Sequence, residues 1–575
     1  MRKFILTAAM LLFTLAAVSA QTKWYNPEEA GFQVIRGQGF QGEERVSLYN
    51  RFPDRAEKMI RKRVWDLSRQ TAGESIRFTT NAKEIKVRYK VALRLAMNHM
   101  PMTGVSGVDL YTYDKHGNEL WLAAKRSFKD TVVYAYPAID IEKKPKEHTY
   151  TLFLPLYNEV TWMEIGTEEG ASFRFEPLAA EKPIVAYGTS ICQGACASRP
   201  GMTWTNILQR RIGHDVVNLG FSGNAYFEHG VIDLVSDIDA SVYILDAMPN
   251  SFSIEAEPLR DTIMKAVRQI RAKRPDAPVL LTDHLGYPHG KAMPEYSKDE
   301  KHALENLAKA YEMLKNEGVS NLHYLTYDEL SIPQDGFVEG IHASDYGMQA
   351  YAEAYEKKLR EIMNEPAGDI RATVPTVQQR DGYNWMQRHA QILKDGEGKH
   401  FKRVLIGDSI MHFWGGVENA HVKRGVQSWS EFDDASLNMG CGYDRTENVL
   451  WRIYHGELDG FTADRITLMI GTNNLSFGDT DEQIAAGISM ILDAIEDRRP
   501  EARITLMGVF PRRGREARVK ELNKVVRALA KEHGVHYADP GKELVGKKGL
   551  IDEGLFTDGL HPNEEGYKRI VGYFM

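Results

Sequence analysis

The chain contains a serine, a carboxylate and a histidine in an order that could form a hydrolytic triad. Ser409 is followed 152 residues later by His561, and Asp558 lies three residues before that histidine. A serine hydroxyl is a weak nucleophile that needs a base to remove its proton. A carboxylate beside the imidazole can orient it and stabilise its protonated form. These residues predict acyl transfer through Ser409, although this serine does not lie in the Gly-x-Ser-x-Gly motif of ordinary α/β-hydrolases.

The same pattern occurs 219 residues earlier, where Ser190, Glu339 and His342 stand at corresponding positions. Between the serine and the acid, Asn218-Leu-Gly corresponds to Asn438-Met-Gly at a shift of 220. A lone serine in a Gly-x-Ser turn is more often a helix cap than a nucleophile. The matched spacing in both halves favours function and predicts a duplicated domain.

Strand-like and helix-like patterns alternate around both sets of residues. Because strands that alternate with helices form parallel sheets covered on both faces, each half is expected to be an α/β/α (flavodoxin-like) domain with a five-stranded parallel sheet. Each serine follows the first strand, at the carboxyl end of the sheet, where such folds place their sites. The expected strands are residues 184–187, 215–219, 241–245, 279–282 and 322–325, then 404–406, 436–438, 466–470, 504–509 and 535–538.

The residues before these two domains have a different texture. Short runs rich in β-branched and aromatic residues alternate between apolar and polar positions, which predicts antiparallel strands and a β-sandwich. Trp24 and Tyr25 in this part could stack on sugar rings, although core packing is the simpler interpretation. The expected organisation is a signal peptide at 1–20, a β-sandwich at 21–180, α/β domains at 181–365 and 381–575, and a linker at 366–380.

The first twenty residues are typical of a secretory signal peptide. Arg2 and Lys3 precede an apolar run over residues 4–18, and small residues follow at the expected cleavage site. The run is shorter than the ~20 residues that a membrane span needs. The protein is therefore expected to be secreted or periplasmic, with no membrane span.

The composition excludes several classes of protein. Of the 575 residues 43% are hydrophobic and 26% charged, which is ordinary for globular domains. The net charge of 72 − 79 = −7, without a long basic run, argues against nucleic acid as a partner. The three cysteines, Cys192, Cys196 and Cys441, are too few for a disulfide framework, although a Cys192–Cys196 bridge is sterically conceivable.

Three blocks of the second half resemble the SGNH (GDSL) hydrolase superfamily: GDS ending at Ser409, GTNN containing Asn473, and DGLHPN containing His561. Residues 444–452 further resemble the catalytic subunits of intracellular platelet-activating-factor acetylhydrolase. The first half resembles SGNH esterases in which a β-sandwich precedes the hydrolase, through SGVDLY at 106–111 and DAMPN at 246–250.

The resemblance implies ester hydrolysis through an acyl-serine intermediate, without metal or cofactor. By this resemblance Asn473 and the Ser409 backbone N–H would donate to the oxyanion, and losing one such donor costs ~2.7–4 kcal/mol. Asn250 and Gly223 would take these roles in the first half. Tyr443 replaces the usual oxyanion glycine in the second half, so its backbone donor is expected to survive if the position needs no positive φ.

Two departures in the first half leave an inactive domain open as an alternative. Glu339 replaces the usual aspartate and is one methylene longer, and Asn250 lies in a block that differs from the commoner Gly-x-Asn-Asp. Three other groups carry less weight. Asp283, His284 and His289 are expected to form a polar loop, and Arg512, Arg513 and Arg515 a solvated charge run. Cys192 and Cys441 are expected to be packed thiols.

The sequence thus predicts an exported serine esterase that removes short acyl groups, chiefly O-acetyl groups, from carbohydrate at two sites. The expected partner is an acetylated glycan or another small ester. Three alternatives stay open: a lipid esterase or lysophospholipase, a glycan-binding protein with one inactive hydrolase domain, and two sites that deacetylate different positions of one sugar.

Overall fold

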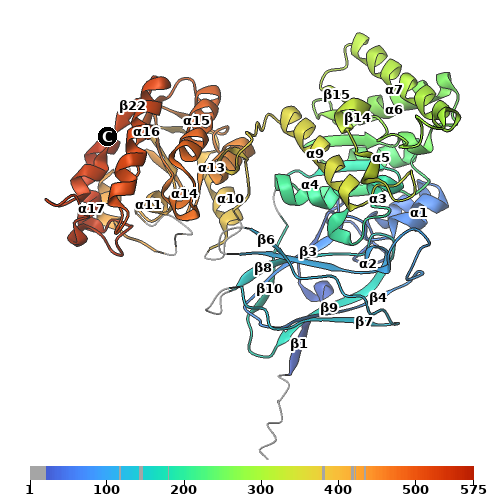
Figure 1. The fold of residues 1–575 in the computed structure, drawn as a ribbon, viewed down its shortest axis with the longest axis horizontal. Coiled ribbons are helices and arrows are strands. Elements are labelled where there is room, and N and C mark those ends of the chain that lie inside the picture. Colours follow the sequence, from blue (N-terminus) through green and yellow to red (C-terminus); the bar gives the residue numbers. More distant parts are fainter. Residues whose placement is uncertain are drawn as a thin grey trace, which may run out of the picture.

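The computed structural model describes residues 21–114, 118–141, 147–178, 181–378, 383–415, 420, 422–432 and 435–575. The expected signal peptide, and residues 379–380 at the end of the expected linker, lie outside these ranges. Figure 1 shows a β-rich part coloured blue to cyan, an α/β part in green and yellow, and a second α/β part in orange and red. None of the described helices is both long and apolar enough to cross a membrane.

The β-rich part consists of two antiparallel sheets that enclose a common core. Along β4, Ile85, Val87 and Tyr89 are buried while the residues between them are less so, which is the period-two pattern of a strand with one face inward. They pack against Phe78 and Leu152 of the other sheet, which confirms the β-rich prediction. The sheets are β1 (Thr22–Tyr25), β9 (Val160–Glu168), β4 (Ile85–Val91) and β7 (Val132–Tyr136), and β10 (Phe173–Phe175), β3 (Ser75–Thr80), β8 (His148–Phe153), β5 (Asp109–Tyr113) and β6 (Glu119–Trp121), with β2 (Ile35–Arg36) beside β3.

One stretch of this N-terminal part belongs to a different core. Helix α1 (Lys62–Ser68) buries Val64, Trp65 and Leu67 in the core of the first α/β domain, together with Phe52. The apolar face of this short helix is thus covered by the α/β domain rather than by the sandwich sheets. The β-sandwich expected over 21–180 is therefore joined to the first α/β domain through shared core packing.

The first α/β domain has a parallel sheet in the order β12-β11-β13-β14-β15. One face is covered by α4 (Trp204–Ile212) and α9 (Asp345–Ile362). The other is covered by α5 (His229–Asp237), α6 (Ala256–Lys273) and α7 (Lys298–Asn316). The strands are β11 (Ile184–Gly188), β12 (Val216–Gly220), β13 (Val242–Asp246), β14 (Val279–Thr282) and β15 (Leu322–Leu325).

The second α/β domain repeats this arrangement with the order β18-β17-β20-β21-β22. Its strands are β17 (Arg403–Gly407), β18 (Ser436–Gly440), β20 (Arg465–Met469), β21 (Arg503–Met507) and β22 (His536–Ala538). Helices α10 (Trp385–Gly396), α13 (Thr446–Arg452), α15 (Asp481–Arg498) and α16 (Glu516–Glu532) cover one face, and α11 (Ser409–His412), α12 (Val426–Phe432) and α17 (Glu564–Ile570) cover the other. The two predicted five-stranded parallel sheets are confirmed.

The segment expected as a linker packs against the second domain. Thr446 on α13 donates from its hydroxyl to the Ala372 carbonyl at 2.8 Å, and the Thr376 N–H donates to the Glu447 carbonyl at 3.1 Å. Ala372 is buried. These contacts fix the segment on the domain that follows it.

Candidate active sites in the two α/β domains

Ser409 lies at the turn between the first strand and the first helix of its domain. The Asp408 side chain caps α11 by accepting from the Ile410 N–H at 2.9 Å. Gly407, the last residue of β17, has no room for a side chain, because a Cβ there would lie 2.7 Å from the Met469 carbonyl oxygen. The strand and the cap together place Ser409 at the carboxyl end of the sheet.

The structure brings the three predicted triad residues of the second domain together. The Ser409 hydroxyl lies 2.8 Å from His561 Nε2, and His561 Nδ1 lies 2.8 Å from Asp558 Oδ2. The other carboxylate oxygen, Oδ1, accepts from the backbone N–H groups of Leu560 at 3.0 Å and His561 at 2.9 Å. The turn that carries the histidine therefore also fixes its acid partner.

The first domain contains the same arrangement with a glutamate. Ser190 Oγ lies 2.8 Å from His342 Nε2, and Nδ1 of that histidine is hydrogen-bonded to Glu339 Oε1. Glu339 Oε2 accepts from the N–H groups of Ile341 at 2.9 Å and His342 at 3.0 Å. The serine–histidine distance equals that of the second domain, so the extra methylene does not displace the imidazole.

Gly223 and Tyr443 occupy corresponding turns with the same backbone conformation. Their φ angles are +66° and +67°. The position therefore does use a positive φ, and the tyrosine adopts it at a cost of ~1–2 kcal/mol for a side chain in the left-handed region. From the sequence, the backbone N–H donor of Tyr443 was expected to survive if the position needed no positive φ. The structure shows instead that the tyrosine adopts the same positive φ as the glycine.

Asn473 and Asn250 are both tied to the loop that carries these turns, but through opposite ends of the amide. Asn473 Nδ2 donates to the Asp444 carbonyl at 2.9 Å, which uses one of its two hydrogens. Asn250 Oδ1 accepts from the Ala225 N–H at 3.1 Å, which leaves its NH₂ group for another acceptor. Each side chain retains a donor that could serve an oxyanion.

The electrostatics of the second domain keep the acid ionised and the base neutral. Burial opposes ionisation of Asp558, but hydrogen bonds from the His561 backbone and imidazole outweigh it and lower its pKa to about 2. Burial lowers the pKa of His561 below its usual value, against the opposing effect of Asp558 and with help from the positive charges of Arg424 and Arg512. In the first domain the pKa of Glu339 is lowered in the same way, because hydrogen bonds from His342 outweigh burial.

Different side chains flank the two triads. In the second domain Arg424 donates to Asp558 Oδ2 at 3.0 Å, and the Phe413 ring lies 5.2 Å from that of His561. In the first domain the ring of His99, from the N-terminal β-rich part, lies 5.5 Å from the His342 ring. The two sites share their triad geometry and differ in the groups that a substrate would meet.

Two pairs of positioning residues were not predicted from the sequence. Gln193 and His412, each three residues after a serine, accept at 3.0 Å from the backbone N–H of Ser222 and Gly442. These N–H groups immediately precede the two positive-φ turns. The equal spacing in the two halves was the available signal, but a glutamine and a histidine do not look alike in sequence.

The second pair consists of buried arginines from outside the two sheets. Arg51 donates to the carbonyls of Asn218 at 3.0 Å and Gly220 at 2.9 Å. Arg388 on α10 donates to the carbonyls of Asn438 and, at 3.3 Å, Gly440. Both arginines thus hold the end of the strand that leads into the positive-φ turn at Gly223 or Tyr443.

The lesser candidates are bonded within their own loops, and the arginine run lies beside the second triad, since Arg513 donates to the Asp558 carbonyl at 3.3 Å. Asp283 accepts from the Tyr327 N–H at 2.8 Å and His284 Nδ1 lies 2.7 Å from Glu300 Oε1, so these two side chains have separate partners. Arg512 is part of the second domain's loop structure, since it donates to the Thr472 carbonyl at 3.0 Å. The three cysteines are buried free thiols, and burial raises the pKa of Cys441 and Cys196 to about 12 and that of Cys192 well above its usual value.

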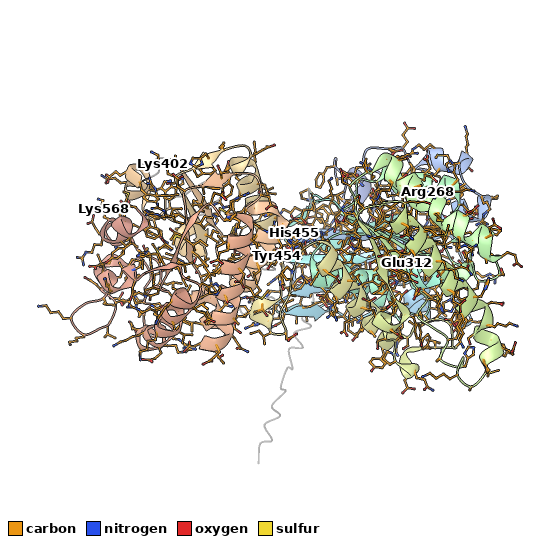
Figure 2. All side chains as sticks on the ribbon, turned by 90° about the horizontal axis from the view of Figure 1, so that it is seen from above. Arg268, Glu312, Lys402, Tyr454, His455 and Lys568 are labelled. Atoms are coloured by element: carbon orange, nitrogen blue, oxygen red, sulfur yellow. The ribbon has the colours of Figure 1, made fainter. Side chains whose placement is uncertain are left out.

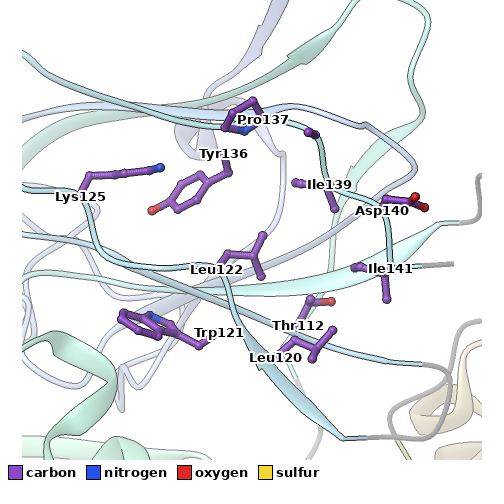
Figure 3. Close-up of a pocket in the computed structure, with 11 residues that line it drawn as sticks. Thr112, Leu120, Trp121, Leu122, Lys125, Tyr136, Pro137, Ile139, Asp140 and Ile141 are labelled. Carbon is purple, nitrogen blue, oxygen red and sulfur yellow. The ribbon is translucent and has the colours of Figure 1, made fainter.

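The aromatic residues at the start of the β-rich part are engaged in packing. The Trp24 ring is covered by the Arg88 guanidinium at 3.9 Å, and Tyr25 stacks on Phe173 at 3.9 Å. A separate depression of about 360 Å³ lies on this part and is lined by Trp121, Lys125 and Tyr136 among others (Figure 3). No triad residue lines it.

Comparison with known proteins agrees with this geometry. Two models described as the GDSL-like Lipase/Acylhydrolase family match residues 181–360 and 405–569, and one described as the N-terminus of Esterase_SGNH_hydro-type matches residues 22–173. Platelet-activating factor acetylhydrolase IB subunit alpha1 of Bos taurus is 33% identical over 201 residues, which is 33% of this chain and 81% of that protein. The Homo sapiens subunit is 32% identical over 199 residues, with the same coverage.

A solved structure described as a GDSL-like lipase from Bacteroides ovatus is 28% identical, with a TM-score of 0.55, and the match covers 60% of this chain and 98% of that one. The two family-model matches lie on the two parallel sheets and include both serine–histidine pairs. The chain therefore belongs to the GDSL/SGNH hydrolases and is an esterase with two such domains in tandem.

Proposed function

We propose that the protein is an exported esterase that removes short acyl groups, chiefly O-acetyl, from carbohydrate, and that both domains are active. The observation that carries this proposal is the serine–histidine separation of 2.8 Å in each domain, with a carboxylate bonded to the far nitrogen of each imidazole. Such a constellation is the one that activates a serine for attack on an ester.

In the proposed reaction Ser409 Oγ attacks the acyl carbonyl carbon while His561 Nε2 takes the hydroxyl proton. The negative charge on the carbonyl oxygen is met by N–H donors of Ser409, Tyr443 and the Asn473 side chain. His561 then gives its proton to the leaving alcohol, which departs and leaves an acyl-serine. Water attacks this ester in the reverse sense, releasing the acid and the free serine. Ser190, His342, Gly223 and Asn250 take these parts in the first domain.

Two features support a short acyl group. The acetylhydrolase relatives are named for acetyl removal, and Tyr443 stands at the oxyanion turn, where its ring would limit the space for an acyl chain. The expected export would bring the enzyme to extracellular glycans. The N-terminal β-rich part supplies His99 beside the first triad, so that site would be built from two domains.

A second candidate, hydrolysis of an acetyl ester on a lipid, is favoured by one observation. The named relatives act on platelet-activating factor according to their names, and residues 444–452 carry the resemblance in this sequence. The second domain is the one to which this alternative applies.

Acetate release from acetylated glycans, compared with an acetylated ether phospholipid and with butyryl and octanoyl aryl esters, tests the proposal. The intact chain, Ser190→Ala, Ser409→Ala and the double variant are assayed in parallel. We expect glycan deacetylation by each single variant, none by the double variant, and a sharp fall with acyl length. Preference for the phospholipid by Ser190→Ala would favour the lipid alternative, and activity of the double variant would refute the serine mechanism.

A further inference from the structure

Four ionisable side chains meet where the two α/β domains touch. His455 belongs to the second domain, and Figure 2 labels it at the junction of the two halves. Its Nε2 lies 2.7 Å from His214 Nε2, 3.7 Å from Glu365 Oε1 and 3.8 Å from Glu181 Oε2. His214 Nε2 lies 3.0 Å from the same oxygen of Glu365. All four come from outside the two triads.

The Nε2 atoms of His214 and His455 face each other, with a lone pair on at least one of them. His455 Nδ1 lies 2.6 Å from the Trp451 carbonyl, which requires a proton on Nδ1 and leaves a lone pair on Nε2. His214 Nε2 faces this lone pair, so at most one proton lies between the two nitrogens.

The cluster also has bonding capacity that the described residues do not use. His214 and Glu365 are only 6% and 3% exposed, yet His214 Nδ1 and Glu365 Oε2 have no hydrogen-bond partner among the residues that the structure describes. The unpaired oxygen of Glu365 gives the cluster a further carboxylate ligand atom, whereas His214 Nδ1 lies on the side of the ring away from His455.

We propose that Glu181, His214, Glu365 and His455 form a site for a divalent transition-metal ion such as Zn²⁺ that joins the two α/β domains. Imidazole nitrogen and carboxylate oxygen are zinc ligands, with bonds of ~2.0–2.2 Å, so tetrahedral ligand atoms lie ~3.3 Å apart. Four of the six separations among these ligand atoms, from 2.7 to 3.8 Å, bracket this value, and Glu181, His214 and His455 each offer a ligand atom within 4.8 Å of the others. The histidine pair would open by ~0.6 Å on binding.

Neighbouring groups support the four ligands and provide access. The Trp451 carbonyl fixes the His455 tautomer, as outer-shell acceptors do for metal-bound histidines. His389 lies 3.4 Å from Glu181 and 2.8 Å from Glu457, and so helps to hold the Glu181 carboxylate. Glu181 is 19% exposed at its side chain and gives the ion a route from solvent. The ion would fix the relative position of the domains and take no part in ester hydrolysis.

Zinc binding by the metal-stripped full-length protein, measured in competition with a chromophoric chelator, tests the proposal. We expect one equivalent to bind, and Co²⁺ to give the intense visible bands of a tetrahedral site. Losing one outer-shell partner costs ~10–100-fold in metal affinity, so His214→Ala and His455→Ala should each lose about 100-fold or more. His302→Ala, at an exposed histidine on α7, is the matched control and should bind as the parent does.

Glu181→Gln keeps a half-buried side chain of the same shape and guards against variants that fail to fold. It should retain the parent circular dichroism spectrum and lose zinc affinity, and zinc should raise the melting temperature of the parent but not of this variant. Less than one equivalent of zinc in the parent, or unchanged affinity in both histidine variants, would overturn the proposal. The cluster would then be a proton-sharing histidine–glutamate network.

Discussion

Arg424 donates at 3.0 Å to Oδ2 of Asp558, the same carboxylate oxygen that lies 2.8 Å from His561 Nδ1. One oxygen thus serves both the His561 imidazole and a permanent cation. The guanidinium stabilises the carboxylate but disfavours a second positive charge on the imidazole, and its effect on His561 is to lower the pKa.

Replacing Arg424 should shift the pH dependence of the second domain. Its charge lowers the pKa of His561, so Arg424→Gln raises that pKa. Because the base acts in its neutral form, the acid limb of the kcat/KM profile should move to higher pH. The profile is measured in a Ser190→Ala background, with Arg527→Gln, an exposed arginine on α16 that lies near Asp539, as the control. An unchanged limb, or one moved to lower pH, would refute the assigned role of Arg424.

Asn473 and its neighbour Asn474 should respond differently to removal. Loss of one oxyanion donor costs about 10²–10³-fold in kcat, so Asn473→Ala in the Ser190→Ala background should show a loss of that size at nearly unchanged KM. Asn474 instead bonds to Asp479 at 2.9 Å and to the Thr446 hydroxyl at 3.1 Å, so Asn474→Ala should chiefly lower the free energy of unfolding. Equal kcat values for the parent and Asn473→Ala would show that this amide does not meet the oxyanion.

Glycine at position 443 should leave stability and activity unchanged, whereas a larger residue at position 223 should lower the free energy of unfolding. Glycine adopts φ = +67° freely, so Tyr443→Gly should keep deacetylation at Ser409 and not lower the melting temperature. At Gly223 a Cβ has no neighbour within 4 Å, so Gly223→Ala should cost only the ~1–2 kcal/mol of the left-handed conformation, measured by urea unfolding. Loss of activity in Tyr443→Gly would mean that the ring itself is needed.

The buried arginine that holds the second oxyanion turn should be structurally important. Arg388→Met leaves the carbonyls of Asn438 and Gly440 without this donor and should lower the free energy of unfolding by about 2–3 kcal/mol. Lys394→Met, on an exposed position of the same helix, is the control and should change it little. If Arg388→Met and Lys394→Met lowered the free energy of unfolding by the same amount, water would be replacing the guanidinium at these carbonyls.

Much of the fold and of both triads could be predicted because local patterns carry them. Five short apolar runs alternate with helices in each half, and parallel strands bring their carboxyl ends to one edge, which places Ser409 after β17. His561 lies in the loop before α17, and its place beside Ser409 was expected from the DGLHPN resemblance. The strand bounds differ from the predicted ones by at most two residues.

The remaining site residues act through contacts that no local pattern encodes. Arg424 lies 134 residues from Asp558 in sequence, and Arg51 lies 167 residues from Asn218, without a motif around either arginine. Tyr443 gives no sign of a positive φ by its type, and only its correspondence with Gly223 could have indicated it. The junction histidines could not be paired before the domains were placed against each other.

Covalent labelling can decide whether the two serines are the nucleophiles. The full-length protein is treated with a fluorophosphonate, which phosphonylates activated serines, and the adducts are located by intact and peptide mass spectrometry. Two adducts are expected on the parent, at Ser190 and Ser409, one on each single serine-to-alanine variant, and none on the double variant or on the heat-unfolded parent. An unlabelled parent, or a double variant labelled as fully as the parent, would contradict the assignment of two serine esterase sites.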